Sequence, residues 1–288
     1  MMETYTKIKT TIELYSNSEF GTLKEVLLCP PKFMKIREVI NETQKHYLNE
    51  NIDTNLAGRQ HQHLLETLQQ HEIQTHLLAA HPELPEQVFT RDIGFTIGDT
   101  LFAAQMKRKI RQGESKSFQL WLEQHGIQAV DMNDEIEGGD VIVDGNAVWV
   151  GRSNRTTKQA IEEVRSQLPN YDIKELKFDP AYLHLDCVFQ PISHKKALCY
   201  PPAFTADTLE LIQNQFELIE VDKEEQFTLA TNVLSIGEKK IISLTLNKKT
   251  NEQLRQHGFN VIPIDISEII KSGGSFRCVT LPLKRLRV

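Results

Sequence analysis

Short apolar runs come in pairs along this chain, and residues that favour a turn split each pair. The clearest pairs are GFTIGDTLFAA, DVIVDGNAVWV and NVLSIGEKKIISL, which turn at Gly98, Gly145 and Gly237. A fourth pair, CVFQPISHKKALCY, is split by a longer polar link. Two apolar runs joined by a short turn indicate a β-hairpin. The pattern therefore predicts four hairpins.

An amphipathic stretch follows each hairpin, and another short apolar run follows that stretch. Apolar residues at helical spacing predict helices over residues 115–125, 156–168, 206–215 and 248–257. Runs such as IQAV and NVIPI then predict one further strand each. The order strand, strand, helix, strand thus repeats along the chain.

One polar residue stands just before each expected hairpin, and we call it the mouth residue. The mouth residues are Asp92, Asp140, Asp186, Asn232 and Cys278, at steps of 48, 46, 46 and 46 positions. A nearly fixed period of this size indicates a repeated supersecondary unit, because each unit buries its apolar face against the next. The sequence predicts five such units.

The last unit keeps only one strand before the chain ends at Val288. The early run 21–31, the helical stretch 57–70 and the run IQTHLL would complete it. If the final strand pairs with the first, the units close into a ring and all five mouth residues point to one axis. An open row of units would scatter them. We expect the ring. We also expect a single domain over residues 1–288, because no linker rich in Gly, Pro or Ser interrupts the chain.

The composition is that of an ordinary globular protein, with 40% hydrophobic and 25% charged residues. The net charge of -6 and the lack of a basic stripe argue against nucleic acid as a partner and favour a small molecule. The first residues show no apolar core with a cleavage site, and no run of 18 apolar residues follows. We therefore expect a cytoplasmic protein that does not enter a membrane. Its four cysteines never form a C-x-x-C pair, which predicts free thiols.

A thiol, a histidine and several carboxylates are expected to meet on the ring axis. Asp92 lies in FTRD, Glu137 in EGGD, His184 and Asp186 in HLDC, and Cys278 follows a Gly-Gly pair. Carboxylates disfavour a second negative charge nearby, so they should raise the pKa of the thiol. A cationic substrate would offset this, and a planar guanidinium also matches carboxylates in a bidentate manner. The pattern therefore predicts a guanidino substrate.

The motifs, taken in order, resemble those of the guanidine-modifying enzymes of the pentein superfamily. They are SEFGTLKEVLLCPP, FTRD, EGGDV, SNRT, HLDCVF, TNVLSIG and GGSFRCVTLPL, and they span residues 18–283. That superfamily includes arginine deiminase, dimethylarginine dimethylaminohydrolase and the glycine amidinotransferases. The resemblance implies an α+β fold of the pentein type, an α/β propeller of five pseudosymmetric ββαβ units in a closed ring.

The resemblance also implies a role for each site residue. Cys278 would attack the guanidinium carbon and form a covalent thiouronium intermediate. His184 would protonate the departing amine and then take a proton from the attacking water. Asp92 and Asp186 would hold the guanidinium nitrogens, and Glu137 would hold the guanidinium or orient His184. No metal or organic cofactor is expected.

An amino-acid substrate also carries an α-carboxylate, for which an arginine is the natural partner. Arg155 in SNRT resembles the family position, and Arg111 is a weaker match by spacing alone. Lys107 and Arg108 stay open as alternatives for that second role. Asn232 also matches a family position, where we expect it to support the loop.

Other polar residues are assigned structural roles. Asp140 is expected to brace the Gly-Gly turn, and Arg91 to form a structural ion pair. His61 and His63 lie two positions apart on a helix, face different directions and are expected at the surface rather than on a metal. The basic run 32–39 fits a solvated face or an active-site flap. Three cysteines are expected to be packing residues: Cys29, Cys187 and Cys199.

The resemblance leaves the individual reaction open. The chain length is close to that of the dimethylarginine hydrolases, yet HLD and GGSFRC look more like the deiminase and amidinotransferase motifs. A dimethylated nitrogen offers no donor to Asp186 and would leave its charge unpaired, so plain arginine should be at least as good a substrate. We expect a hydrolase that produces citrulline from arginine or a methylated arginine. One alternative is an amidinotransferase. The other is a binding protein such as the ribosome anti-association factors of this fold. A homodimer through the early helices stays open.

Overall fold

Fifteen strands form five three-stranded sheets in the computed structural model, which describes residues 12–288. Every sheet has the same plan: two strands pair antiparallel, and a third strand, reached through a helix, joins the second in parallel. This is the predicted ββαβ unit. The prediction that the chain starts without a leader peptide concerns residues that include the segment 1–11, which lies outside the described residues.

Four units follow one another between residues 94 and 264. The first has β3 (Gly94–Ile97), β4 (Thr100–Ala103), α3 (Lys109–His125) and β5 (Val130–Asp131), and the second has β6 (Val141–Asp144), β7 (Ala147–Arg152), α4 (Lys158–Gln167) and β8 (Asp172–Lys177). The third has β9 (Phe189–Pro191), β10 (Lys196–Cys199), α5 (Ala206–Gln213) and β11 (Glu217–Glu220), and the fourth has β12 (Leu234–Gly237), β13 (Lys240–Leu244), α7 (Lys248–Gln256) and β14 (Asn260–Ile264). The four predicted helices are confirmed, although α3 begins six positions early because its first turns bury the ion pair of Arg111 and Glu114 instead of an apolar face.

The fifth unit joins the two ends of the described chain. It has β15 (Leu281–Arg285), β1 (Leu23–Leu28), α2 (Thr54–Gln70) and β2 (Gln74–Leu77). Strand β15 pairs antiparallel with β1, with Pro282 opposite Val26 and Leu281 opposite Leu27. The predicted pairing of the last strand with the first is therefore confirmed.

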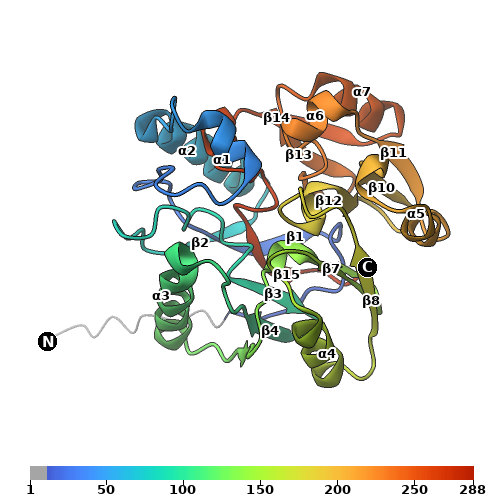
Figure 1. Ribbon diagram of the computed structural model, residues 1–288, viewed down its shortest axis with the longest axis horizontal. Coiled ribbons are helices and arrows are strands. Elements are labelled where there is room, and N and C mark those ends of the chain that lie inside the picture. The colour runs from blue at the N-terminus through green and yellow to red at the C-terminus, as the bar shows by residue number, and fades with distance from the viewer. Residues whose placement is uncertain (1–11) are drawn as a thin grey trace, which may run out of the picture.

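The units lie around a common middle. Figure 1 shows α2, α3, α4, α5 and α7 on the outside, with β1, β3, β12 and β15 nearer the centre. Neighbouring units touch through β15 and β3, through β6 and β9, and through β1 and β12. The sheets themselves stay separate, so residues 12–288 form an α+β array of small sheets and no closed sheet.

Glycines set the hairpin turns, and short helices fill the links. Gly98 and Gly145 have positive φ angles of 58° and 63°, which glycine adopts without a Cβ clash. Three short helices were not predicted, because four to six residues are too few for a helical period: α1 (Glu42–Tyr47), α6 (Lys223–Phe227) and α8 (Ser267–Ile270).

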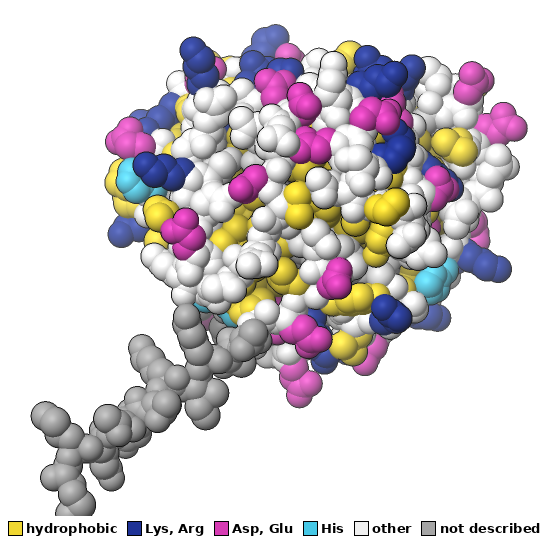
Figure 2. All heavy atoms as spheres, turned by 90° about the horizontal axis from the view of Figure 1, so that it is seen from below, with side chains coloured by type: hydrophobic (Ala, Val, Ile, Leu, Met, Phe, Trp, Pro, Cys, Tyr) yellow, Lys and Arg dark blue, Asp and Glu magenta, His cyan; other side chains and the backbone are white. Residues whose placement is uncertain are grey.

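The exterior carries charges of both signs. Figure 2 shows one face of the molecule, on which basic and acidic side chains are interspersed rather than gathered by sign. Within residues 12–288, none of the helices combines the length and apolar character needed to cross a bilayer.

Candidate active site

Segments that precede the first strands of the units meet in the middle of the molecule. Asn232, just before β12, accepts hydrogen bonds at its side-chain oxygen from the backbone N–H groups of Arg277 and Cys278, at 3.1 and 3.2 Å. Cys278 Sγ lies 3.8 Å from Asp186 Oδ2. The expectation that Asn232 supports the cysteine loop is confirmed, and three mouth residues are in direct contact.

The loop before Cys278 needs its glycines. A Cβ on Gly274 would lie 2.9 Å from Cys278 Cβ and 2.4 Å from the Phe89 ring, closer than real Cβ contacts. Gly273 has a φ of 97°, which is strained for any other residue. The Gly-Gly pair therefore lets the loop turn tightly and presents the thiol beside Phe89.

The thiol of Cys278 is buried, with 2% of the residue exposed. Burial, and then the negative charges of Asp186 and Asp92, raise its pKa well above the usual value. The free site therefore holds a neutral thiol, as the cluster of acidic residues in the sequence indicates. A cation placed beside the sulfur would favour the thiolate.

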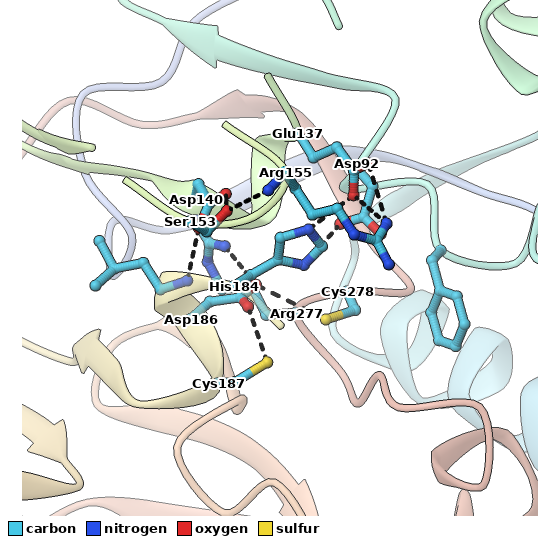
Figure 3. A network of polar contacts seen from close by, with 12 residues as sticks. Asp92, Glu137, Asp140, Ser153, Arg155, His184, Asp186, Cys187, Arg277 and Cys278 are labelled. Carbon is cyan, nitrogen blue, oxygen red and sulfur yellow. Dashed lines mark hydrogen bonds and ion pairs between the residues drawn. The ribbon is translucent and has the colours of Figure 1, made fainter. Parts of the chain in front are cut away.

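His184 stands between two carboxylates. Its Nε2 donates to Glu137 Oε2 at 2.8 Å, and its Nδ1 lies 3.7 Å from Asp92 Oδ1 (Figure 3). Neither Nδ1 nor Oδ1 has a hydrogen-bond partner, although both atoms are buried. A Cβ on Gly139 would lie 2.6 Å from Nδ1 and 3.1 Å from Oδ1, so glycine leaves these two groups accessible to each other.

The charges of His184 and Glu137 stabilise each other. Burial would lower the pKa of His184, but Asp92, Glu137 and Asp140 raise it to about 9. Burial would raise the pKa of Glu137, but the hydrogen bond from His184 and the charges of His184 and Arg155 lower it to about 2. At neutral pH the imidazole is therefore protonated and can donate a proton.

Arg155 and Arg111 lie at the site and are already paired with carboxylates. Arg155 Nη1 donates to both oxygens of Glu137 at 3.2 Å, and Arg111 Nη1 donates to Asp92 Oδ2 at 2.6 Å. The rest of the Arg111 guanidinium contacts Glu114 and the Phe89 carbonyl oxygen. Both arginines therefore hold the acidic residues in place.

The two alternatives to Arg111 lie farther out. Lys107 pairs with Glu135 at 2.8 Å, with 40% of its side chain exposed. Arg108 lines an outer cavity of about 180 Å³, which Arg155 also lines. Arg155 is thus the arginine that both the inner site and this outer cavity share.

Asp186 does not have a free carboxylate, which the sequence did not reveal. Its Oδ2 accepts a hydrogen bond from Arg277 Nη1 at 2.7 Å, while its Oδ1 lies 3.6 Å from Cys187 Sγ. An internal guanidinium thus occupies the oxygen nearest to Cys278. The argument that a dimethylated nitrogen would leave Asp186 unpaired is therefore wrong, because Arg277 supplies the counter-charge. The only sequence signal was the position of Arg277 beside the cysteine.

A small cavity of about 10 Å³ lies next to Cys278 and has room for about one water molecule. Its lining includes four of the residues above and three that sequence analysis did not single out: Asp92, Arg111, Arg155, Cys278, Ile40, Glu86 and Leu183. Burial raises the pKa of Glu86 to about 7. Sequence alone could not distinguish Glu86 from the nearby Glu83, which is exposed.

Residues 40–47, which we call the cover segment, close this cavity. The Ile40 carbonyl oxygen accepts a hydrogen bond from Arg155 Nη2 at 3.0 Å, and Asn41 Nδ2 donates to the Ser272 carbonyl oxygen at 3.0 Å. Gln44 Nε2 donates to Glu86 Oε1 and Ser272 Oγ at 2.9 and 2.8 Å. A substrate larger than water requires the cover segment to move, and the interpretation of the adjoining run 32–39 as a solvated face or a flap stays a prediction.

Three site residues have the right donors for a metal ion. Ligand atoms of Asp92, Glu137 and His184 lie within 4.8 Å of one another. The guanidinium groups of Arg111 and Arg155 already balance the two carboxylates, however, and they would repel a cation. This repulsion is strongest for a compact divalent ion, and the absence of a metal stays a prediction.

The remaining expectations have mixed outcomes. Asp140 accepts hydrogen bonds from Ser153 and Thr156 at 2.6 Å each and from the Leu185 backbone at 2.9 Å, so it braces loops. Arg91 forms an ion pair with Glu19 at 3.6 Å, as expected.

The predicted surface placement of His61 is wrong. Its helical face packs inward, only 2% of the residue is exposed, and burial lowers its pKa to about 4.

Comparison with known proteins supplies the wider context. Residues 30–285 match the family model for N,N dimethylarginine dimethylhydrolase, eukaryotic. The chain is 50% identical to the uncharacterized protein YkgA of Bacillus subtilis, over 93% of this chain and 94% of that protein. It is 28% identical to the N(G),N(G)-dimethylarginine dimethylaminohydrolase of Mycobacterium tuberculosis, over 89% of this chain and 84% of that one.

A solved structure shares the architecture. The product-bound N-terminal domain of ArgZ, an arginine dihydrolase of cyanobacteria, aligns with a TM-score of 0.82 and 26% identity, over 91% of this chain and 97% of that one. Another structure of that domain holds a covalently bound reaction intermediate. The predicted relationship to the pentein superfamily is confirmed by these neighbours.

Proposed function

This chain belongs to the N,N-dimethylarginine dimethylhydrolase family, whose relatives hydrolyse C–N bonds of amidines, and on that premise we propose that it converts arginine or a methylated arginine to citrulline. The observation that carries the proposal is the grouping of Cys278, the His184–Glu137 pair and the unpartnered oxygen of Asp92 at one buried site. These are the groups that amidine hydrolysis through a covalent intermediate requires.

The first half of the reaction forms a covalent adduct. The substrate guanidinium donates to Asp92 Oδ1, and its positive charge beside Cys278 favours release of the thiol proton to solvent. The sulfur attacks the guanidinium carbon, the bond from that carbon to the terminal nitrogen breaks, and His184 Nδ1–H gives its proton to the departing ammonia or amine. A thiouronium on Cys278 remains.

The second half uses water. His184, now neutral, takes a proton from a water molecule that attacks the thiouronium carbon. The carbon–sulfur bond breaks, the hydroxyl proton of the adduct passes to the departing sulfur, and citrulline leaves with Cys278 again a neutral thiol. The covalent intermediate in the related ArgZ domain supports this route. No metal or organic cofactor takes part, and treatment with EDTA should leave the rate unchanged.

The amino-acid end of the substrate meets Arg155 and Glu86. When the cover segment opens, Arg155 Nη2 loses its contact with the Ile40 carbonyl and can bind the α-carboxylate. Glu86 accepts hydrogen bonds only from the neutral groups of Gln44 and Ser272, so it can also receive the α-ammonium. Arg111 is less suited, because all of its donor groups already have partners.

The five units supply the frame for this chemistry. We propose that they close into the ring of a single pentein domain, which the pairing of β1 with β15 and the contacts between neighbouring units support. The proposed partner is a small guanidino compound, and we expect neither nucleic acid nor a membrane as a partner. A homodimer through the early helices is a further proposal, which light scattering would test.

The test is citrulline formation from arginine, monomethylarginine and dimethylarginine in parallel. Wild type should form product from at least one of them, and Cys278→Ser should form none. Cys199→Ser is the matched control, because Cys199 is equally buried but belongs to β10, away from the site. The ratio of kcat/KM values then ranks the substrates. We expect these values to be comparable, because Arg277 already pairs with Asp186.

Other results would change the assignment. A covalent adduct on Cys278 that an added amine discharges, without citrulline, would indicate an amidinotransferase. Absence of both product and adduct would reject catalysis on these substrates and favour a protein that only binds.

A further inference from the structure

Arg277 precedes the proposed nucleophile and is fully buried, yet the proposed reaction assigns it no role. Its guanidinium contacts segments from different units. Nη1 donates to Asp186 Oδ2 at 2.7 Å, and Nη2 donates to the Val141 carbonyl oxygen at 2.6 Å. Nε and Nη2 each donate to a separate oxygen of Glu19 at 3.1 Å. A lysine or a smaller residue at position 277 could not make all of these contacts at once.

The partner of greatest interest is Asp186. Its carboxylate lies between two thiols, with Oδ2 at 3.8 Å from Cys278 Sγ and Oδ1 at 3.6 Å from Cys187 Sγ (Figure 3). The oxygen that faces Cys278 is the same oxygen that Arg277 holds. The charge felt by the sulfur therefore depends on whether that ion pair is intact.

Glu19 is the second carboxylate that pairs with the Arg277 guanidinium. Burial would raise its pKa, but Arg277 and Arg91 lower it to about 2, so it stays ionised. Arg285 also faces this group and donates to the carbonyl oxygens of Gly21 and Ser235. The other charged or titratable groups that face Cys278 or line its cavity are Asp92, Cys187, Glu86, Arg111 and Arg155, and His184 lies beside Asp92. Arg277 is the cation that directly contacts the carboxylate nearest to the sulfur.

We propose that Arg277 is a positioning residue for Cys278: it fixes Asp186 beside the sulfur and balances the charge of that carboxylate. This inference rests on the proposed role of Cys278 as nucleophile. Without Arg277, Asp186 would present an uncompensated negative charge to the thiol. Arg277 donates to the oxygen that lies 3.8 Å from the sulfur, so loss of its positive charge should lower the thiolate fraction at a given pH about tenfold or more.

The experiment measures the second-order rate of Cys278 alkylation by iodoacetamide at pH 9, with the modified peptide identified by mass. Because only the thiolate reacts, this rate follows the thiolate fraction in the open state of the cover segment and needs no substrate. Failure of the proposed function would leave the measurement intact. Arg277→Met should react more slowly than wild type, by about one order of magnitude or more. The double variant Arg277→Met/Asp186→Asn, which removes both charges, should return to the wild-type rate or above it.

Two further variants separate charge from packing. Glu19→Gln removes the other carboxylate on the same guanidinium and should stay within about twofold of wild type, since Asp186 keeps its partner. Arg277→Lys keeps the charge with a smaller change and serves if Arg277→Met fails to fold. It should fall between wild type and Arg277→Met.

The direction of the change decides the result. If Arg277 only supports the fold, its loss loosens the site and alkylation becomes faster. A faster rate in folded Arg277→Met, or an equally slow rate in the double variant, would overturn the proposal. Circular dichroism of each variant establishes that the folded state is the one measured.

Discussion

Two buried atoms face each other at this site without hydrogen-bond partners: His184 Nδ1 and Asp92 Oδ1. A buried polar atom without a partner costs on the order of 1–3 kcal/mol, so native proteins tolerate it mainly where a ligand completes the set. Gly139 preserves this arrangement, because any side chain there would enter the space beside both atoms. At the scale of residues, Asp92 Oδ1 is thus free to accept a hydrogen bond from a ligand N–H group, and His184 Nδ1–H is free to donate a proton.

Gly139→Ala tests this arrangement. The new Cβ would lie 2.6 Å from His184 Nδ1 and must displace the imidazole or the Asp92 carboxylate. We expect kcat/KM to fall about 100-fold or more, since small displacements of reacting groups cost this much. Gly58→Ala is the matched control. It lies inside α2 with nothing within 4 Å of its Cβ, and it should raise the free energy of unfolding by about 0.5–1 kcal/mol. Equal activity of Gly139→Ala and wild type would contradict the role given to this glycine.

His184 also gives stability a pH dependence. Its pKa is about 9 in the folded protein, above the unfolded value of 6.5. Its contribution to the free energy of unfolding is therefore fully present below pH 6.5 and is lost as pH rises through about 9. Urea unfolding of wild type and His184→Gln at pH 6, 7.5 and 9 should show a difference that shrinks over this window. A difference that grows with pH would mean that the imidazole is neutral in the folded protein.

At the scale of elements, the cover segment connects the cavity beside Cys278 to the loop that carries Cys278. Its helix α1 is too short to be stable alone, and side-chain contacts hold it on the rest of the molecule. Gln44 contacts Glu86 and Ser272 on the inside, while His46 and Tyr47 pack against Phe227 on the outside. Ser272 begins the loop that leads to Cys278, so the cover segment and the nucleophile share one attachment.

Gln44→Met removes the inner attachment with little change in side-chain volume. It leaves Glu86 with one donor fewer and should raise amide hydrogen exchange across residues 40–47 about tenfold, because the closed state loses its hydrogen bonds. Gln62→Met on the exposed face of α2 is the control and should exchange like wild type. Unchanged exchange in Gln44→Met would show that the outer aromatic contacts alone hold the segment.

At the scale of the whole molecule, the sheet of β15, β1 and β2 connects the ends of the described chain. Leu281 and Leu283 of β15 are fully buried, and Arg285 donates to carbonyl oxygens near β1 and in β12. Because Cys278 lies just before β15, the pairing that completes the fifth unit also fixes the proposed nucleophile. The fold and the site therefore depend on the same strand.

A chain that stops after Thr280 tests this dependence. It loses β15, exposes the inner edge of β1 and should lose cooperative thermal unfolding altogether, since several fully buried side chains are removed. A chain that stops after Leu286 retains β15 and should unfold like wild type within a few degrees. Cooperative unfolding of the shorter chain would show that the other four units form the stable core.

Much of this architecture is present in local sequence patterns. The alternation of apolar pairs, turns and amphipathic stretches predicted the ββαβ units, and the period of 46 to 48 residues indicated that their mouths meet. These features depend on neighbours in the chain, so they can be recognised without a structure. The grouping of His184, Glu137, Asp92 and Cys278 followed from the same period together with the family resemblance.

The state of the charged groups could not be predicted in the same way. The pairing of Asp186 with Arg277 joins residues 91 positions apart, and that of Gln44 with Glu86 joins residues 42 positions apart. Each depends on side-chain directions that only packing fixes. The sequence by itself determined how many units form, in what order, and which reactive residues they carry, because those follow from local periodicity. Only the tertiary structure decided which carboxylates are already neutralised and what closes the cavity, because burial and distance set the strength of those interactions.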